Sequence, residues 1–131
     1  MRRVITFGTF DLFHIGHLNI LARARTFGDH LCVGVSSDEM NEDKKGFRPL
    51  FPLADRLAIV GALRVVDAVF VEESMAHKRS YIERHRADVL VMGGDWEGRF
   101  DDLRDLCEVV YLPRTADISS SALKERLRFP V

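Results

Sequence analysis

The sequence predicts an α/β fold, a Rossmann-like five-stranded parallel sheet with helices on both faces. Two patterns lead to this prediction. Five short apolar runs are continuous rather than alternating, which is typical of strands that are covered on both faces. The stretches between them carry apolar residues at three- and four-residue spacing, as amphipathic helices do. Because strand and helix alternate along the chain, right-handed crossovers and a parallel sheet are favoured.

The predicted elements follow one another in a simple order. Strands are expected at residues 4–7, 31–35, 68–71, 89–92 and 109–112. Helices are expected at residues 16–27, 53–64, 77–86, near 101–106 and from 119 to about 127. Segment 36–52 is the least periodic part and is predicted to be a mobile loop. The length of 131 residues, with no repeat or linker, indicates a single domain over residues 1–131.

The composition narrows the class of protein. The net charge of −1 gives no overall basic field, so a nucleic-acid partner is not expected. No apolar run approaches the roughly 20 residues of a transmembrane helix, and the first strand begins too early for a signal peptide. We therefore expect a cytoplasmic protein without a membrane partner. Cys32 and Cys107 lie in apolar strand-like runs and are expected to be buried, reduced thiols.

The segment after the first strand is the strongest candidate for a binding site. It has the sequence GTFDLFHIGH from Gly8 to His17 and leads directly into a helix. His14 and His17 are three residues apart and share one side of the first helical turn. The free amides and the dipole at a helix start favour an anion, and Gly8 would let it approach the backbone. A phosphate site is predicted. Metal ligation and ordinary capping or core histidines remain alternatives, although two histidines without nearby cysteines or a carboxylate cluster make a poor zinc site.

These residues resemble the signature of a known superfamily. Gly-Thr-Phe-Asp joined to His-x-Gly-His is the pattern of the nucleotidyltransferases that include the cytidylyltransferases. The resemblance implies that His14 and His17 bind the nucleotide phosphates and stabilise the transition state at the α-phosphorus. It also implies nucleotide contacts at Gly8, Thr9 and Phe10, and an acceptor contact at Asp11. No metal held by the protein alone is expected.

Two further segments at the carboxyl ends of predicted strands fit this interpretation. In open parallel sheets, ligands bind beyond these ends. In segment 36–52, Lys44, Lys45 and Arg48 could clamp a triphosphate, and the family carries a phosphate-binding lysine there, for which Lys44 is favoured over Lys45. After the fourth strand, Asp95 could bind ribose hydroxyls or hold Mg²⁺ through water. The family pattern there is Gly-Asp-Asp-Trp, with Gly94 replacing the first Asp.

A second specific motif follows the fifth strand. It has the sequence PRTADISSS from Pro113 to Ser121 and resembles the family's Arg-Thr-x-x-Ile-Ser-Thr-Thr. Ser119 is a natural N-cap for the last helix. Arg114 and clustered hydroxyls at a helix start suit β- and γ-phosphates. We expect Arg114 to be catalytic. The expected nucleotide contacts of this motif are Thr115, Ile118, Ser119 and Ser120.

The helix predicted over 53–64 carries the last candidates. Arg56 and Arg64 are eight residues apart, and Arg64-Val65-Val66-Asp67 resembles the Arg-x-x-Asp that ends this helix in the family. The resemblance implies that Arg56, Arg64 and Asp67 lie at the acceptor, where the guanidinium fork of Arg56 or Arg64 would suit its phosphate. An Arg–Asp ion pair that only shapes the fold is the alternative.

Taken together, the motifs most resemble small bacterial glycerol-3-phosphate cytidylyltransferases. The resemblance implies that CTP and sn-glycerol 3-phosphate give CDP-glycerol and pyrophosphate by direct in-line attack. It also implies Mg²⁺ bound with the CTP phosphates, a homodimer, and a product that feeds teichoic-acid or related polymers. The alternatives are a cytidylyltransferase for another phosphorylated alcohol or sugar, an adenylyltransferase, and a nucleotide-binding regulator that is not an enzyme.

Overall fold

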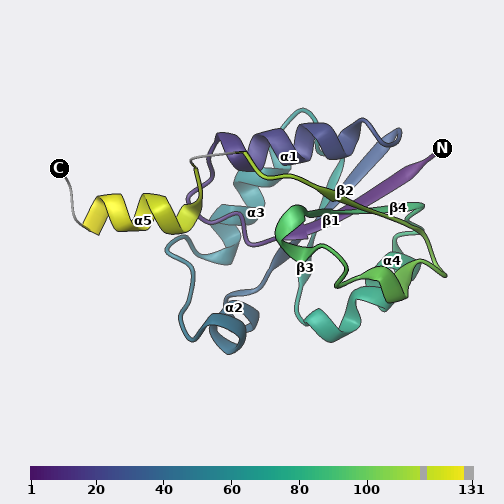
Figure 1. Ribbon diagram of the computed structural model, residues 1–131. Helices are drawn as coiled ribbons and strands as arrows, with labels where there is room; N and C mark the ends of the chain where they lie inside the picture. Colours follow the sequence, from purple (N-terminus) through teal and green to yellow (C-terminus); the bar gives the residue numbers. More distant parts are fainter. Residues whose placement is uncertain (116–117, 129–131) are drawn as a thin grey trace.

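The predicted parallel sheet is confirmed. The computed structural model describes residues 1–115 and 118–128, and its five strands are parallel and ordered β3-β2-β1-β4-β5 (Figure 1). The order reverses between β1 and β4, so the carboxyl ends of these two strands form the switch point at which such sheets bind ligands. The strands are β1 Arg3–Gly8, β2 His30–Ser36, β3 Ala68–Glu72, β4 Val89–Gly93 and β5 Glu108–Leu112.

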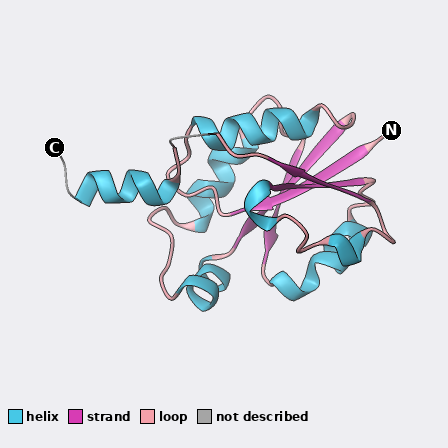
Figure 2. Cartoon of the chain, viewed as in Figure 1, coloured by secondary structure: helices cyan, strands magenta, loops and turns pink. Residues whose placement is uncertain are grey.

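Helices cover both faces of this sheet (Figure 2). The α-helices are α1 Ile15–Arg25, α2 Asp38–Lys45, α3 Leu53–Gly61, α4 Lys78–Arg84 and α5 Ser120–Arg128. Single 3₁₀ turns are η1 Met75–His77, η2 Gly94–Trp96 and η3 Asp101–Leu103, so the helix expected near 101–106 is one short turn. The helix expected at 53–64 ends early, at Gly61.

Segment 36–52 differs from the prediction, because it contains the helix α2. The hydroxyl of Ser37 caps its start by accepting from the Met40 amide at 3.0 Å. Gly46, with φ of +83°, ends it in the left-handed conformation that glycine adopts easily. The two caps stabilise a helix that apolar periodicity does not reveal, since only Met40 and Asn41 are buried in it.

Successive residues of each strand enter two separate cores. Val4 of β1 packs with α1 and α3 on one face, whereas Ile5 packs with α4 on the other. Both side chains are fully buried, which explains why the strands are continuous apolar runs. Cys32 in β2 is buried, and Cys107 is half-buried just before β5 rather than inside a strand.

The last helix stands apart from these layers. Figure 1 shows α5 extending away from the sheet, on the side opposite the N-terminus. None of its side chains is buried, and Leu127 is 70% exposed. Within the described part of the chain, no helix is long and apolar enough to cross a membrane.

Candidate active site

A cavity of about 400 Å³ lies at the switch point of the sheet. Its walls come from the carboxyl ends of β1 and β4 and from the segments that follow β1, β4 and β5. These are the segments in which the sequence concentrates its motif residues. The polar and charged side chains in its lining include His14, His17, Lys45, Asp95, Arg114 and Ser119.

The two motif histidines form the start of α1. The Nδ1 atom of His14 accepts from the Gly16 amide at 3.0 Å, and the Nδ1 atom of His17 accepts from the His14 amide at 3.2 Å. This reciprocal arrangement is a capping box in which imidazoles replace the usual side chains. Because each Nδ1 is an acceptor, the proton of each neutral ring must be on Nε2.

The Nε2 atoms are therefore donors available to a ligand. His14 Nε2 is buried and has no hydrogen-bond partner among the described residues. The two rings are stacked with centroids 3.9 Å apart, which aligns them along one wall of the cavity. A buried donor without an acceptor costs free energy, so this geometry suits the binding of an anionic oxygen beside the histidines.

Both imidazoles are neutral near pH 7. Burial lowers the pKa of His17 to about 4, and the neighbouring His14 adds to this effect. Burial and the nearby Arg114 also lower the pKa of His14. A neutral imidazole can still donate from Nε2, so the pair supplies hydrogen bonds rather than positive charge.

Backbone geometry in the motif explains its glycines. A Cβ atom on Gly16 would lie 2.8 Å from the His14 ring, so the motif needs glycine there for the capping histidine to fold over the helix start. The space beside Gly8 is filled by the ring of Phe10 rather than left for a ligand. Phe10 itself has φ of +56°, an unusual conformation for a bulky residue, and this turn aims the following segment at the cavity.

The second motif closes the cavity from the other side. Arg114 forms an ion pair with Asp95 at 3.0 Å, and both side chains are largely exposed and so could turn to a ligand. Thr115 accepts from Asn19 of α1 at 3.0 Å. Ser119 caps α5, as predicted, by accepting from the Ala122 amide at 3.0 Å. Ile118, Ser119 and Ser120 line the cavity with them, while Ala116 and Asp117 lie outside the described residues.

Asp11 lines the first cavity, but its carboxylate already has several partners within the protein. It is only 3% exposed, and its carboxylate accepts from the Leu50 amide at 2.8 Å, the Phe51 amide at 2.9 Å and Lys124 at 2.9 Å. Burial alone would raise its pKa, but these partners outweigh burial and lower it. The backbone oxygen of Asp11 also accepts from Ser120 at 2.6 Å. Asp11 thus links the loop before α3 and the helix α5 to the motif.

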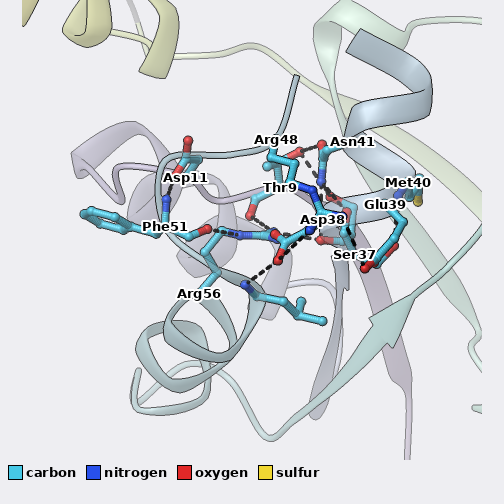
Figure 3. A network of polar contacts seen from close by, with 12 residues as sticks. Thr9, Asp11, Ser37, Asp38, Glu39, Met40, Asn41, Arg48, Phe51 and Arg56 are labelled. Atoms are coloured by element: carbon cyan, nitrogen blue, oxygen red, sulfur yellow. Dashed lines mark hydrogen bonds and ion pairs between the residues drawn. The ribbon is translucent and has the colours of Figure 1, made fainter. Parts of the chain in front are cut away.

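Arg56 is likewise a structural residue in this geometry. Its side chain is 0% exposed, and Figure 3 shows it at the centre of a polar network. Nε donates to Phe51 O, Nη1 donates to Thr9 O and Ser36 O, and Nη2 pairs with Asp38 at 2.7 Å. All its nitrogens are engaged, so Arg56 does not present donors to an acceptor. It fixes the backbone around the cavity instead.

Arg64 and Asp67 lie at the end of the sheet opposite the cavity, where the strands begin. Asp67 directly precedes β3, accepts from the Leu31 amide at 2.8 Å and pairs with Arg25 at 3.2 Å. Arg64 is exposed in the turn after α3, beyond the end of the helix. Neither residue lines the cavity. The structure therefore places both residues away from this cavity, at the amino ends of the strands.

A second cavity of about 390 Å³ adjoins the first, and the two share Lys45, Trp96 and the end of β1. Lys44 lines only the second cavity, with its ammonium 5.4 Å from the Trp96 ring centroid. Burial lowers the pKa of both lysines. Lys45 thus lines the same cavity as the histidines, whereas Lys44 lines only the adjoining one.

Sequence reasoning missed two residues of the second cavity. Glu72 ends β3, and its carboxylate forms a buried ion pair with Lys78 at the start of α4. Burial lowers the pKa of Lys78 and raises that of Glu72, because it disfavours both charged forms. The attraction between the two charges acts in the opposite direction. Lys78 also lies 4.2 Å from the Phe7 ring centroid. The sequence could have pointed to Glu72 through its position at the carboxyl end of a strand, where ligands bind.

Metal ligands are sparse around both cavities. In residues 1–115 and 118–128, no group of three or more His, Cys, Asp or Glu side chains is placed to hold a metal ion. Asp95 uses one carboxylate oxygen for Arg114 and lines the first cavity. One carboxylate together with ligand phosphates is the usual protein contribution to a Mg²⁺ site, so Asp95 fits a metal that arrives with a nucleotide.

Comparison with known proteins gives a consistent result over almost the whole chain. The model of the family described as Cytidylyltransferase-like matches residues 5–126. The glycerol-3-phosphate cytidylyltransferase of Bacillus subtilis is 47% identical, covering 97% of this chain and 98% of that protein. The Staphylococcus aureus enzyme of the same name is 45% identical over 97% and 96%. The solved lipopolysaccharide core biosynthesis protein of Thermoplasma volcanium superposes with a TM-score of 0.77 at 25% identity, covering 88% and 98%.

Proposed function

Because this chain belongs to the cytidylyltransferase-like family, we propose that it transfers a cytidylyl group from CTP to sn-glycerol 3-phosphate. The products are CDP-glycerol and pyrophosphate. One observation carries the reaction type: two imidazoles at a helix start, with Nδ1 used for capping and Nε2 left as the donor, line a cavity that also contains Lys45 and Arg114. The nearly full-length identity to two glycerol-3-phosphate cytidylyltransferases supports the choice of substrates.

The histidines act on the α-phosphate. An oxygen of the acceptor's phosphate attacks the α-phosphorus in line, and the bond from that phosphorus to the bridging oxygen of pyrophosphate breaks. Negative charge builds up on the non-bridging oxygens during this step, where His14 and His17 donate. Their positions are fixed by the capping bonds, so little reorganisation is needed as the charge develops.

Cationic residues divide between the two substrates. Lys45 and Arg114 share the first cavity with the histidines and bind the β- and γ-phosphates. Lys44 lines the second cavity and binds the phosphate of glycerol 3-phosphate. Their convergence beside β1 brings the two phosphates together, which supplies the positioning that phosphoryl chemistry mainly requires.

Mg²⁺ is part of this proposal. Asp95 would hold it together with the CTP phosphates, and the ion would neutralise charge on the leaving pyrophosphate. Arg114, which pairs with Asp95 in the structure, would then turn to the phosphates. A homodimer, a cytoplasmic location and use of the product in teichoic-acid synthesis stay predictions, and light scattering of the purified protein tests the first.

A pyrophosphate-release assay tests the proposed function. Four nucleoside triphosphates are each combined with glycerol 3-phosphate and other phosphorylated alcohols and sugars. We expect CTP with sn-glycerol 3-phosphate to give the highest kcat/KM. Equal or faster turnover with ATP would favour an adenylyltransferase, and a better acceptor would reassign the second substrate. Binding of CTP without any turnover would favour the regulator.

A further inference from the structure

A third cavity, of about 320 Å³, lies at the end of the sheet opposite the active site. It is formed where β1, β2 and β3 begin and α4 ends, at the right of Figure 1 near the N-terminus. We call it the basal cavity. Its polar lining is almost entirely basic, with the side chains of Arg3, Arg84, Arg86, His30 and His85.

The positive charge of the basal cavity is not neutralised by the protein. No carboxylate belongs to its lining, and Arg3, Arg84 and Arg86 form no ion pair with any residue that the structure describes. The nearby Asp88 carboxylate accepts from the backbone amide of Arg3 at 2.8 Å. Three guanidinium groups with like charge repel one another, so they would be stabilised by an anion between them.

The histidines of the basal cavity add unsatisfied polar atoms. His30 Nδ1 and His85 Nε2 are both buried and have no hydrogen-bond partner among the described residues. Cys32 Sγ lies 3.7 Å from His85 Nδ1. Burial raises the pKa of Cys32 to about 11, so its thiol keeps the proton and can donate to His85 Nδ1.

That contact fits one tautomer of the His85 ring, in which Nδ1 accepts from the Cys32 thiol. With Nδ1 as an acceptor, the proton of neutral His85 is on Nε2, the atom that lacks a partner. The ring is also stacked on Phe70, with centroids 4.2 Å apart, which fixes its orientation. A buried N–H donor held in place beside three unneutralised guanidinium groups calls for an oxygen acceptor that carries negative charge.

We propose that the basal cavity is a second anion site that binds a phosphate group, separate from the active site and built from Arg3, Arg84, Arg86 and His85. Guanidinium forks match the geometry of phosphate oxygens, and imidazole Nε2 supplies one more donor. Occupancy would neutralise charge where three parallel strands begin. The phosphate could belong to inorganic phosphate, to pyrophosphate or to a nucleotide, and these three are compared directly.

The NMR signals of the histidine rings in the full chain report anion binding at each site separately. The rings are assigned with His30→Gln and His85→Gln, and the wild type is titrated with inorganic phosphate, pyrophosphate and CTP at constant ionic strength. We expect saturable shifts of the His85 and His30 signals with a Kd of about 1 mM or below for at least one of the three. Signals of His14 and His17 report the active site in the same samples.

A matched pair of variants tests which guanidinium groups are responsible. Arg84 and Arg126 each lie in the last turn of a helix, but only Arg84 lines the basal cavity. We expect Arg84→Ala to weaken the response of His85 about tenfold, because a charge-assisted bond is lost, and Arg126→Ala to leave it unchanged. Arg86 has φ of +53°, so Arg86→Asn removes its charge with a residue that tolerates this backbone.

Two results would overturn the proposal. Shifts that rise linearly up to about 50 mM of all three anions would mean that no specific site exists. Equal affinities in Arg84→Ala, Arg86→Asn and Arg126→Ala would mean that the anion binds elsewhere. Thermal unfolding of each variant distinguishes loss of the site from loss of the fold.

Discussion

Arg56 and the histidine pair both lie near the carboxyl ends of the strands, but they differ in how many of their hydrogen-bond donors the protein itself uses. Arg56 is fully buried, and each of its three nitrogens donates to a protein oxygen. His14 is also anchored by the protein, through Nδ1, but its Nε2 has no partner in the described part of the chain. Both were expected at a substrate. The comparison teaches that the donors left over after folding, rather than the residue type, identify the group that acts on a ligand.

The largest expected effect is on stability, at Arg56. Arg56→Ala removes the closer ion-pair partner of the half-buried Asp38, leaving Arg48 at 4.0 Å, and removes the donor from the carbonyl oxygens of Phe51 and Thr9. We expect the free energy of unfolding to fall by about 3–5 kcal/mol, measured with urea. The matched control Arg64→Ala removes an exposed arginine and should cost no more than about 0.5 kcal/mol. A stable but inactive Arg56→Ala protein would instead indicate a role at the acceptor.

Arg114 is the opposite kind of arginine, exposed and with one ion pair that a ligand can replace. We expect Arg114→Ala to lower kcat/KM for CTP by about 10- to 100-fold, because charge-assisted bonds to the triphosphate are lost. Its free energy of unfolding should stay close to that of the wild type. Arg114→Lys should recover only part of the loss, because a point charge does not reproduce the planar fork. Normal steady-state kinetics in Arg114→Ala would contradict this role.

The adjacent lysines at the end of α2 are expected to bind different substrates. Lys44 lines the second cavity only, whereas Lys45 also lines the first. We expect Lys44→Met to raise KM for glycerol 3-phosphate about tenfold, and Lys45→Met to raise KM for CTP by a similar factor. Each variant is the control for the other, since both remove one charge from the same helix. The reverse pattern would exchange the two assignments.

A further expected effect is on the pH dependence of stability. His17 has a pKa of about 4 when folded, compared with the ordinary value of 6.5. As the pH falls from 6.5 towards 4, the unfolded chain binds a proton that the folded chain does not, so the free energy of unfolding decreases. His17→Gln keeps a capping acceptor but cannot titrate. The pH dependence should therefore be shallower in His17→Gln, and identical slopes would mean that His17 is not buried as a neutral ring.

The sequence predicts the sheet and the two main motifs because these depend on local patterns. Continuous apolar runs identify the strands, and His14 and Arg114 stand in motifs at strand ends. The helix α2 was missed because its caps, Ser37 and Gly46, stabilise it without an apolar face. The burial of Arg56 depends on contacts with residues up to 47 positions away in the chain, which no local pattern records.

The acceptor side was the least predictable part of the site for the same reason. Glu72 and Lys78 line the second cavity because the sheet brings the end of β3 and the start of α4 next to β1, but their charges are used in a buried ion pair with each other. Asp11 resembles a ligand contact in the motif, but its carboxylate is satisfied by the backbone of residues 50 and 51. In both cases the tertiary contacts decide whether a charged side chain has any capacity left for a substrate.

The most direct test of the central claim is the kcat of His14→Asn, measured together with its free energy of unfolding. Asparagine is among the best N-cap residues, so its side-chain oxygen can replace Nδ1 as the acceptor for Gly16 while the Nε2 donor is lost. We predict stability within about 0.5 kcal/mol of the wild type and a kcat lowered about 10²- to 10³-fold with CTP and glycerol 3-phosphate. A normally folded His14→Asn protein that keeps more than about a tenth of the wild-type kcat would contradict the claim that the donor left over at His14 acts on the α-phosphate.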